Sequence, residues 1–319
     1  MKKKILATVP LFSMRCAQAK KMLEDAGLEV IEYKGDLVMT TEEIRAVGSD
    51  IVGAIIGCDE WNDEVFDACP QLKVIARFGI GYENIDLDAA TRHGVKVCNV
   101  RGVNCDSVGE ATIMFVLACL RNLVTLTDTT KEGQWMRYTG HTLKGKTYGL
   151  VGFGAVARYV AKLLTSFDVA KIYAYDLYPN MAEAERLGVT MTDLDTIVRE
   201  CDVISLHVPC TPETTGLFNE EMFRKMKKDT VFVNVARGPI VDTQALCKAL
   251  NEGWIAAAAL DVFAVEPVEK DSPILTAKNL ICMPHQAADT YETFDAVGQF
   301  DAKIVLDVLQ GIRPQNELN

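Results

Sequence analysis

Short apolar runs alternate with amphipathic segments along most of the chain. In the first hundred residues, segments with helical spacing separate β-type runs at 3–9, 30–33, 51–56, 72–78 and 95–99. The run Ile51–Ile56 is apolar at nearly every position, which is typical of a strand buried on both faces of a parallel sheet. This alternation predicts a doubly wound α/β domain for the first part of the chain.

The same pattern resumes in the second half. Strand-like runs lie at 148–151, 171–175, 202–208, 230–235, 256–262 and 280–283, and helical segments include 219–226, 242–250 and 291–309. Between the two halves, Ser107–Arg121 is apolar over the length of a long helix. Such a helix must be buried, either between domains or against a second subunit. The chain therefore reads as two α/β domains with parallel sheets.

A glycine turn connects the first strand of the second half to a helix. The stretch TYGLVGFGAVARYVA places Gly152, Gly154 and Ala157 in the pattern G-x-G-x-x-A, directly after a strand and at the start of a helix. Gly152 allows the sharp turn, and Gly154 has no side chain to keep a diphosphate from the backbone. The N–H groups that open the helix and its dipole favour an anion. The pattern indicates a dinucleotide site, although a glycine turn without a ligand gives the same sequence.

An acidic residue follows the next strand. Asp176 lies nineteen residues after Ala157, and Leu177, Tyr178 and Pro179 come next. A carboxylate at this place accepts hydrogen bonds from ribose hydroxyls and repels a 2′-phosphate, and no neighbouring Arg or Lys would bind that phosphate. Asp176 therefore favours NAD over NADP; the other interpretation is an ordinary turn residue.

Composition excludes several classes of protein. The 319 residues predict two domains, and a formal net charge of −11 argues against nucleic acid as a partner. The apolar part of MKKKILATVP is too short for a signal peptide, and no run reaches transmembrane length, so we expect a cytoplasmic protein without membrane contact. The ten cysteines form no C-x-x-C motif and the four histidines show no metal spacing, so we expect reduced thiols and no metal site.

Three polar residues follow apolar strands of the second half. Arg237 comes after TVFVNVA, Glu266 after AAALDVFAV, and His285 after LICMP. Each by itself could be a turn or loop residue. Since the carboxyl ends of parallel strands meet at one edge of the sheet, we expect the three side chains to face the crevice that holds the nucleotide. In the first half, the stretch RFGIGYENID similarly leaves backbone N–H groups around Ile80 at a strand end.

Five motifs resemble the D-isomer-specific 2-hydroxyacid dehydrogenases. In family order they are RFGIGYENIDLDAAT, HVPCTPET, VNVARGPIVD, ALDVFAVEP and PHQAADT. The likeness runs from about Ile51 to Leu309 and is greatest to the short, phosphoglycerate dehydrogenase-like members. It implies a flavodoxin-like substrate domain of residues 1–100 and 288–319, a Rossmann NAD domain of residues 101–287, and a homodimer held mainly through the NAD domain.

The resemblance also assigns roles to individual residues. His285 would exchange a proton with the substrate hydroxyl, a task that suits a group titrating near neutral pH. Glu266 would orient the imidazole, and Arg237 would bind the substrate carboxylate and polarise the carbonyl. Ile80 and Gly81 would bind the same carboxylate through their backbone. The implied contacts to NAD, beyond Gly152, Gly154 and Asp176, are Ala155, Val156, Val208, Pro209, Val235, Ala236 and Asp261.

Two departures from the family pattern leave the substrate open. Gln286 and Ala287 replace an apolar residue and a glycine after the histidine, and the stretch IIGCDEWN supplies no basic residue for a substrate phosphate. The basic residues that remain are Arg77 and Lys73. D-3-phosphoglycerate is therefore one candidate substrate, and glyoxylate, hydroxypyruvate or a bulkier 2-keto acid is the other.

Two functions outside this class share features of the sequence. An NAD(H)-responsive binding protein would keep the same Arg, Glu and His, and a methyltransferase also uses a glycine loop followed by an acid. An NAD-dependent oxidoreductase that interconverts a D-2-hydroxy acid and its 2-keto acid accounts for all five motifs.

Overall fold

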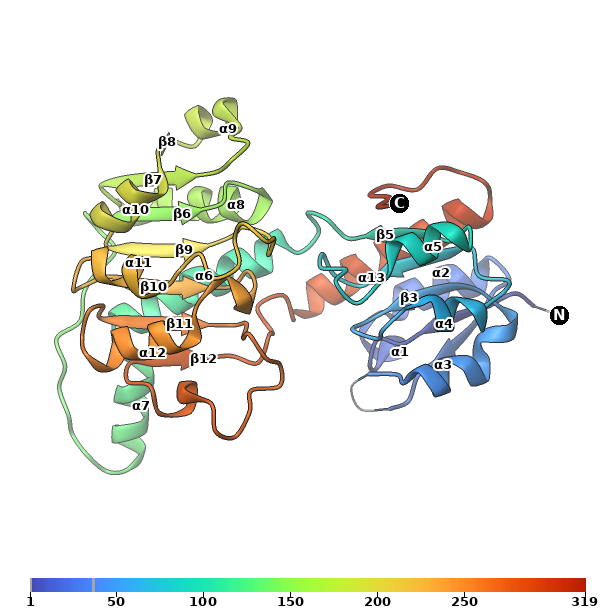
Figure 1. Cartoon of the computed structure of the whole chain (residues 1–319), viewed down its shortest axis with the longest axis horizontal. Helices are drawn as coiled ribbons and strands as arrows, with labels where there is room; N and C mark the ends of the chain where they lie inside the picture. The colour runs from blue at the N-terminus through green and yellow to red at the C-terminus, as the bar shows by residue number, and fades with distance from the viewer. Residues whose placement is uncertain (1, 36–37) are drawn as a thin grey trace. The chain divides into compact units, whose positions relative to one another are not determined.

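The computed structural model describes residues 2–35 and 38–319 and divides into two compact units (Figure 1). Unit 1 consists of Met1–Asn104 and Asp289–Asn319, and unit 2 of Cys105–Ala288. Each unit is built on its own parallel sheet with helices on both faces. The predicted class, two doubly wound α/β domains, is confirmed.

The sheet of unit 1 has five strands in the order β2-β1-β3-β4-β5, which is the flavodoxin-like order. Its strands are β1 (Lys4–Ala7), β2 (Glu29–Glu32), β3 (Ile51–Ile56), β4 (Val74–Arg77) and β5 (Lys96–Asn99). Its helices are α1 (Phe12–Arg15), α2 (Ala17–Asp25), α3 (Thr41–Val47), α4 (Asp63–Asp67), α5 (Leu87–Arg92) and α13 (Tyr291–Leu309), with a 3-10 turn at Gly48–Asp50.

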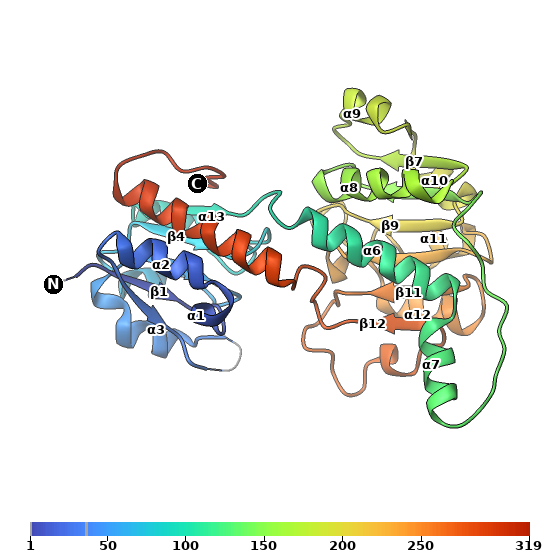
Figure 2. The ribbon, with the colours of Figure 1, turned by 180° about the vertical axis from the view of Figure 1, so that it is seen from behind.

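Two hydrophobic clusters cover the two faces of this sheet. One joins β-strand residues to α2 and α13, and the other joins them to α3, α4 and α5 (Figures 1 and 2). All six residues of β3 are buried, as its uninterrupted apolar sequence predicts. Thr40 caps α3, and its side chain and that of Glu43 form the reciprocal pair of a capping box.

The sheet of unit 2 has seven strands in the order β12-β11-β10-β9-β6-β7-β8. Its strands are β6 (Thr147–Val151), β7 (Lys171–Tyr175), β8 (Val189–Met191), β9 (Val203–Leu206), β10 (Val231–Asn234), β11 (Ala257–Leu260) and β12 (Leu280–Cys282). The chain reverses its direction of travel across the sheet between β6 and β9, and such a switch point is where open α/β sheets bind ligands.

Helices α6 (Cys105–Leu120) and α8 (Ala155–Leu164) pack against one another on one face of this sheet (Figure 2). The other face carries α10 (Leu194–Glu200), α11 (Glu220–Lys225) and α12 (Thr243–Asn251) (Figure 1). The remaining elements are α7 (Leu123–Lys131), α9 (Met181–Arg186) and 3-10 turns at Thr165–Phe167, Gly238–Ile240 and Pro273–Thr276.

Helix α6 is mostly buried, whereas α7 is not. Ten of the sixteen residues of α6 are buried, and none of the nine residues of α7 is. Helix α7 and the loop after it extend away from the body of unit 2 (Figure 2). Of the helices in the described residues, none could cross a membrane alone; only α6 and α7 together have the length and apolar composition, with a bend of 63° between them.

Candidate active site

The glycine turn of unit 2 lies at the switch point. Gly152 follows β6 with a φ of 94°, and a Cβ built there would lie 2.7 Å from the carbonyl carbon of His207, which follows the neighbouring strand β9. Only glycine permits both the backbone angle and this approach. Gly154 is the N-cap of α8, and no described atom lies within 4 Å of a Cβ built there.

Asp176 holds the turn in place from the end of β7. Its Oδ2 accepts a hydrogen bond of 2.7 Å from the N–H of Phe153, and its Oδ1 accepts one of 2.8 Å from the N–H of Tyr178. A carboxylate oxygen can accept more than one hydrogen bond, so both oxygens remain able to accept from ribose hydroxyls.

These features fit a dinucleotide. Helix α8 has ten residues, and no side chain in the described part of the chain caps its N-terminus, so its first N–H groups are available to a diphosphate. The other predicted contacts follow β9, β10 and β11 at the same edge of the sheet: Val208, Pro209, Val235, Ala236 and Asp261. These residues thus follow the strands that lie next to β6 on one side of the sheet.

His285 and Glu266 lie together at this edge. Nδ1 of His285 is 2.8 Å from Oε2 of Glu266, and the N–H of Phe263 donates a 2.8 Å hydrogen bond to Oε1 of the same carboxylate. Because Nδ1 faces the carboxylate, Nε2 points away from it, and the His285 side chain is 53% exposed. The arrangement presents an oriented imidazole that can exchange a proton.

Asp261 fixes the turn that carries His285. The backbone of His285 has a φ of 54°, in the left-handed region, and its N–H donates to the carbonyl of Asp261 at 2.8 Å. The Asp261 carboxylate then accepts from the N–H of Gln286 at 2.8 Å and of Ala287 at 3.0 Å. Three hydrogen bonds to one residue therefore stabilise an unfavourable backbone conformation at the imidazole.

Arg237 is brought next to the segment that carries Glu266. A Cβ built on Gly238 would lie 1.9 Å from the carbonyl carbon of Phe263, so only glycine allows the turn after β10 to pack on this segment. The side chain of Asn234 receives the N–H of Ala236 at 2.9 Å and donates to the carbonyl of Arg237 at 2.9 Å. The turn that presents the guanidinium is thus held on both sides.

His207 behaves differently from His285. Its Nε2 lies 2.8 Å from the buried hydroxyl of Ser205, and burial lowers the pKa of His207 to about 3. The imidazole is therefore neutral near pH 7 and serves to hold the end of β9, whose carbonyl contacts Gly152.

The predicted substrate residues of unit 1 follow β4. Arg77 ends the strand, its Nη1 donates to the carbonyl of Phe78, and its Nη2 lies 3.9 Å from Sγ of Cys58. Ile80 and Gly81 come next, and their N–H groups have no acceptor in the described residues. The suggestion that Lys73 assists Arg77 is wrong, because Lys73 precedes β4 and so lies at the opposite end of the strand.

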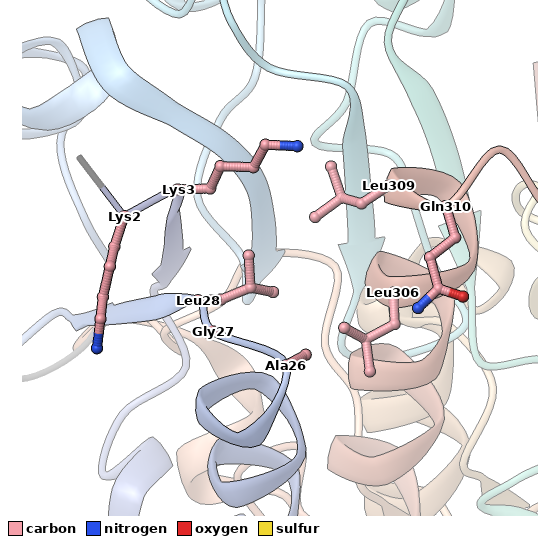
Figure 3. A pocket seen from close by; sticks show the side chains of 8 residues that line it. All are labelled: Lys2, Lys3, Ala26, Gly27, Leu28, Leu306, Leu309 and Gln310. Atoms are coloured by element: carbon pink, nitrogen blue, oxygen red, sulfur yellow. The ribbon is translucent and has the colours of Figure 1, made fainter.

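A hollow of about 700 Å³ in unit 1 lies at the amino ends of the strands. It is formed where Lys3 leads into β1, Leu28 leads into β2, and Leu306 and Leu309 end α13 (Figure 3). These are the amino ends of the strands, whereas Arg77, Ile80 and Gly81 lie at the carboxyl ends. The hollow is therefore separate from the candidate site. In the described residues, no group of three His, Cys, Asp or Glu side chains could hold a metal ion.

Comparison with known proteins identifies the family. Residues 113–287 match the family model described as "D-isomer specific 2-hydroxyacid dehydrogenase, NAD binding domain". The chain is 43% identical over 268 residues to a glyoxylate reductase of Thermofilum pendens, covering 82% of this chain and 79% of that protein. The chain belongs to the D-isomer-specific 2-hydroxyacid dehydrogenases. The family recognised from the five motifs is confirmed.

Two further 2-hydroxyacid dehydrogenases show how far the likeness extends. A D-3-phosphoglycerate dehydrogenase of Archaeoglobus fulgidus is 38% identical over 319 residues, which are 99% of this chain but 59% of that protein. The apo structure of D-lactate dehydrogenase from Escherichia coli superposes with a TM-score of 0.87 at 28% identity, covering 99% of this chain and 100% of that one. The chain is thus an NAD-dependent oxidoreductase that interconverts a D-2-hydroxy acid and its 2-keto acid.

Some residues that build the site were not anticipated. Gly238 appears in the sequence only as a glycine before a proline, and its close approach to Phe263 depends on how two loops pack. Asn234 and Asn99 are polar residues at the ends of buried strands, which is the same signal that drew attention to Arg237 and His285. Applying that signal to asparagine as well as to charged residues would have found them.

Proposed function

We propose that this 2-hydroxyacid dehydrogenase reduces a short, unphosphorylated 2-keto acid such as glyoxylate or hydroxypyruvate, with His285 as the proton donor. The observation that carries the catalytic part is the 2.8 Å pair of His285 and Glu266, at the carboxyl ends of the sheet that also carries the dinucleotide fingerprint. In the reverse direction His285 accepts the proton of the substrate hydroxyl.

Each catalytic side chain has a task that its surroundings support. Glu266 accepts from Nδ1 of His285, which fixes the tautomer and directs Nε2 to the substrate oxygen. Arg237 binds the substrate carboxylate and polarises the carbonyl through its guanidinium. Ile80 and Gly81 bind the carboxylate through backbone N–H groups that have no acceptor in the described residues.

The NAD contacts are proposed from the strand ends of unit 2. Gly152, Gly154, Ala155 and Val156 take the diphosphate, and Asp176 takes the ribose. The remaining proposed contacts are Val208, Pro209, Val235, Ala236 and Asp261. When bound, the nicotinamide ring supplies or accepts the hydride. In this proposal residues 101–287 form the NAD domain, and residues 1–100 with 288–319 form the substrate domain.

The surroundings of Arg77 support an unphosphorylated substrate. Nη1 of Arg77 is used within its own turn, Cys58 lies beside Nη2, and the next residues along from Cys58 are two acids. Asp59 is buried and receives the N–H of Met39 at 2.6 Å. A phosphate with nearly two negative charges would find few free cations here.

A phosphorylated substrate is the second candidate. Arg101 follows β5, the neighbour of β4, and is exposed, so it could join Arg77 at the same edge of the sheet. The whole-chain likeness to a D-3-phosphoglycerate dehydrogenase also favours this substrate.

Initial rates of NADH oxidation with glyoxylate, hydroxypyruvate, pyruvate and phosphohydroxypyruvate test the proposal. We expect kcat/KM for one of the unphosphorylated acids to exceed that for phosphohydroxypyruvate by at least about tenfold. If kcat/KM is instead highest for phosphohydroxypyruvate, and Arg101→Gln lowers that value, the second candidate is established. NADH binding without turnover of any keto acid would contradict both and favour a binding protein.

We also propose that the chain forms a homodimer in the cytoplasm through the apolar surface of α6, α7 and the loop that follows. Met114, Leu123, Val124, Trp135, Met136 and Tyr138 are exposed there. A helix with no buried residue gains little stability from packing on its own unit, and a patch of this kind is typical of an interface. All ten cysteines are free, which suits a reducing compartment.

Light scattering after size exclusion tests the dimer. We expect the wild type to have the mass of two chains and the double variant L123D/W135D to have the mass of one. Tyr291→Asp, which changes another exposed aromatic residue, serves as the control and stays dimeric. A wild-type monomer, or a dimer that survives both charges, would contradict the proposal.

A further inference from the structure

The C-terminal tail of unit 1 pairs with the edge strand β5. Cys98 and Glu317 form an antiparallel bridge, and the N–H of Leu318 donates to the carbonyl of Val97 at 2.8 Å. Asn319 receives the N–H of Val97 at 2.8 Å through its side-chain oxygen. The tail therefore covers hydrogen-bonding groups that an edge strand would otherwise expose.

The tail also reaches the end of β5 at Asn99. The N–H of Asn99 donates to the carbonyl of Asn316 at 3.4 Å, and Nδ2 of Asn316 donates to the carbonyl of Asn99 at 3.2 Å. Asn316 has a φ of 56°, a left-handed conformation that asparagine adopts more readily than most residues. The backbone of Asn99 is thus held from the tail through both its donor and its acceptor.

The end of β5 in turn holds the loop after β4. Asn99 is 4% exposed, and its Nδ2 donates a 2.7 Å hydrogen bond to the carbonyl of Ile80. The N–H of Val100 donates to the carbonyl of Gly79 at 3.2 Å. Two successive carbonyls of the loop therefore accept hydrogen bonds from two successive residues at the end of β5.

These two bonds determine where the free N–H groups of the loop point. A peptide unit is planar, so its C=O and its N–H point in opposite directions. The carbonyl of Ile80 shares a peptide unit with the N–H of Gly81, and the carbonyl of Gly79 shares one with the N–H of Ile80. Because the two carbonyls point toward β5, both N–H groups point away from it. A hydrogen bond accepted by a carbonyl also polarises the N–H of the same peptide unit.

We propose that Asn99 is a positioning residue for the substrate carboxylate and that the C-terminal tail, through Asn316, keeps Asn99 in place. The proposal rests on the proposed function, in which the N–H groups of Ile80 and Gly81 bind that carboxylate. Asn99 does not touch the substrate; it orients the donors that do.

The test compares substrate affinity with turnover in three variants. Asn99→Ala removes the donor to Ile80. Asn316→Gly keeps the left-handed backbone but removes the side-chain bond to the carbonyl of Asn99, and Asn319→Ala disturbs the tail at its far end only. For Asn99→Ala we expect KM for the preferred keto acid, and the Kd of the unreactive analogue oxamate for the enzyme with NADH, to rise about tenfold. We expect kcat and the Kd of NADH to stay within about threefold of wild type.

The other variants sharpen the result. Asn316→Gly should raise the oxamate Kd by about two- to threefold, and Asn319→Ala should leave it unchanged. If Asn99→Ala fails to fold, a rise in Asn316→Gly alone supports the proposal. The proposal is overturned if the oxamate Kd is unchanged in Asn99→Ala, or in Asn316→Gly where Asn99→Ala does not fold. It is also overturned if kcat, NADH binding and melting temperature fall in parallel. Failure of the proposed function would instead appear as wild-type protein that binds NADH without turnover.

Discussion

Nδ1 of His285 lies 2.8 Å from Oε2 of Glu266, although His285 is nineteen positions further along the chain and a strand lies between them. The carboxylate is itself fixed by the N–H of Phe263, and the backbone turn that carries the imidazole by three hydrogen bonds that end at Asp261. Both partners are therefore preorganised before substrate arrives.

Glu266→Gln should reduce kcat about 10- to 100-fold, equivalent to about 1.4–2.7 kcal/mol in the activation barrier. The amide is nearly the same shape, but it can present a donor where Nδ1–H needs an acceptor, so the imidazole loses its fixed tautomer. Steady-state rates with NADH and the preferred keto acid measure the effect. Glu269→Gln, an exposed acid three residues later, is the matched control and should keep wild-type kcat.

Asp176→Asn should weaken the preference for NAD over NADP. The carboxylate repels a 2′-phosphate, and an amide of the same size removes this charge while still accepting from Phe153. We expect the ratio of kcat/KM for NADPH to that for NADH to rise about tenfold. Asp229→Ala removes an exposed acid elsewhere on unit 2 and should leave the ratio unchanged. A constant ratio in Asp176→Asn would show that the ribose binds elsewhere.

Asp301→Asn should stabilise unit 1 near pH 7. Asp301 is fully buried on α13 and neither carboxyl oxygen has a hydrogen-bond partner in the described residues, so burial raises its pKa well above the ordinary value, while Arg77 opposes the rise. The unfolded chain releases this proton near pH 4 and the folded chain keeps it, so the wild type loses stability as pH rises above about 4.

Urea denaturation at several pH values measures this difference. The gain from Asp301→Asn should be small at pH 4 and should grow by up to about 1.4 kcal/mol for each pH unit between the unfolded and folded pKa values. Asp295→Asn changes an acid on the same helix whose Oδ2 accepts from Gln299, and it should give no such pH dependence. A variant less stable than wild type at pH 7 would mean that the Arg77 attraction outweighs desolvation.

The regular parts of this structure follow from local sequence patterns, and several contacts that build the site do not. The strand Ile51–Ile56 and the turn at Gly152 could be predicted because burial on both faces requires apolar residues and a positive φ favours glycine. Helix α7 was not predicted, since its threonine-rich sequence has low helix propensity and none of its nine residues is buried.

The supporting residues of the site depend on packing between distant segments. Gly238 is required only because Phe263 comes within van der Waals distance of it, and Asn99 matters only because the loop of Ile80 lies beside β5. Lys73 and Arg77 are four residues apart in sequence, yet a strand places them at opposite ends of the sheet. Spacing along the chain identifies strand-end residues, but pairwise contacts require the three-dimensional structure.

The most direct test of the central claim is to measure kcat and NADH affinity together for His285→Gln. If His285 transfers the proton, kcat with the preferred keto acid should fall by at least about 10³-fold while the Kd of NADH stays within about threefold of wild type. A variant that keeps more than a tenth of wild-type turnover would contradict the account, and so would one that loses NADH binding in proportion to its rate.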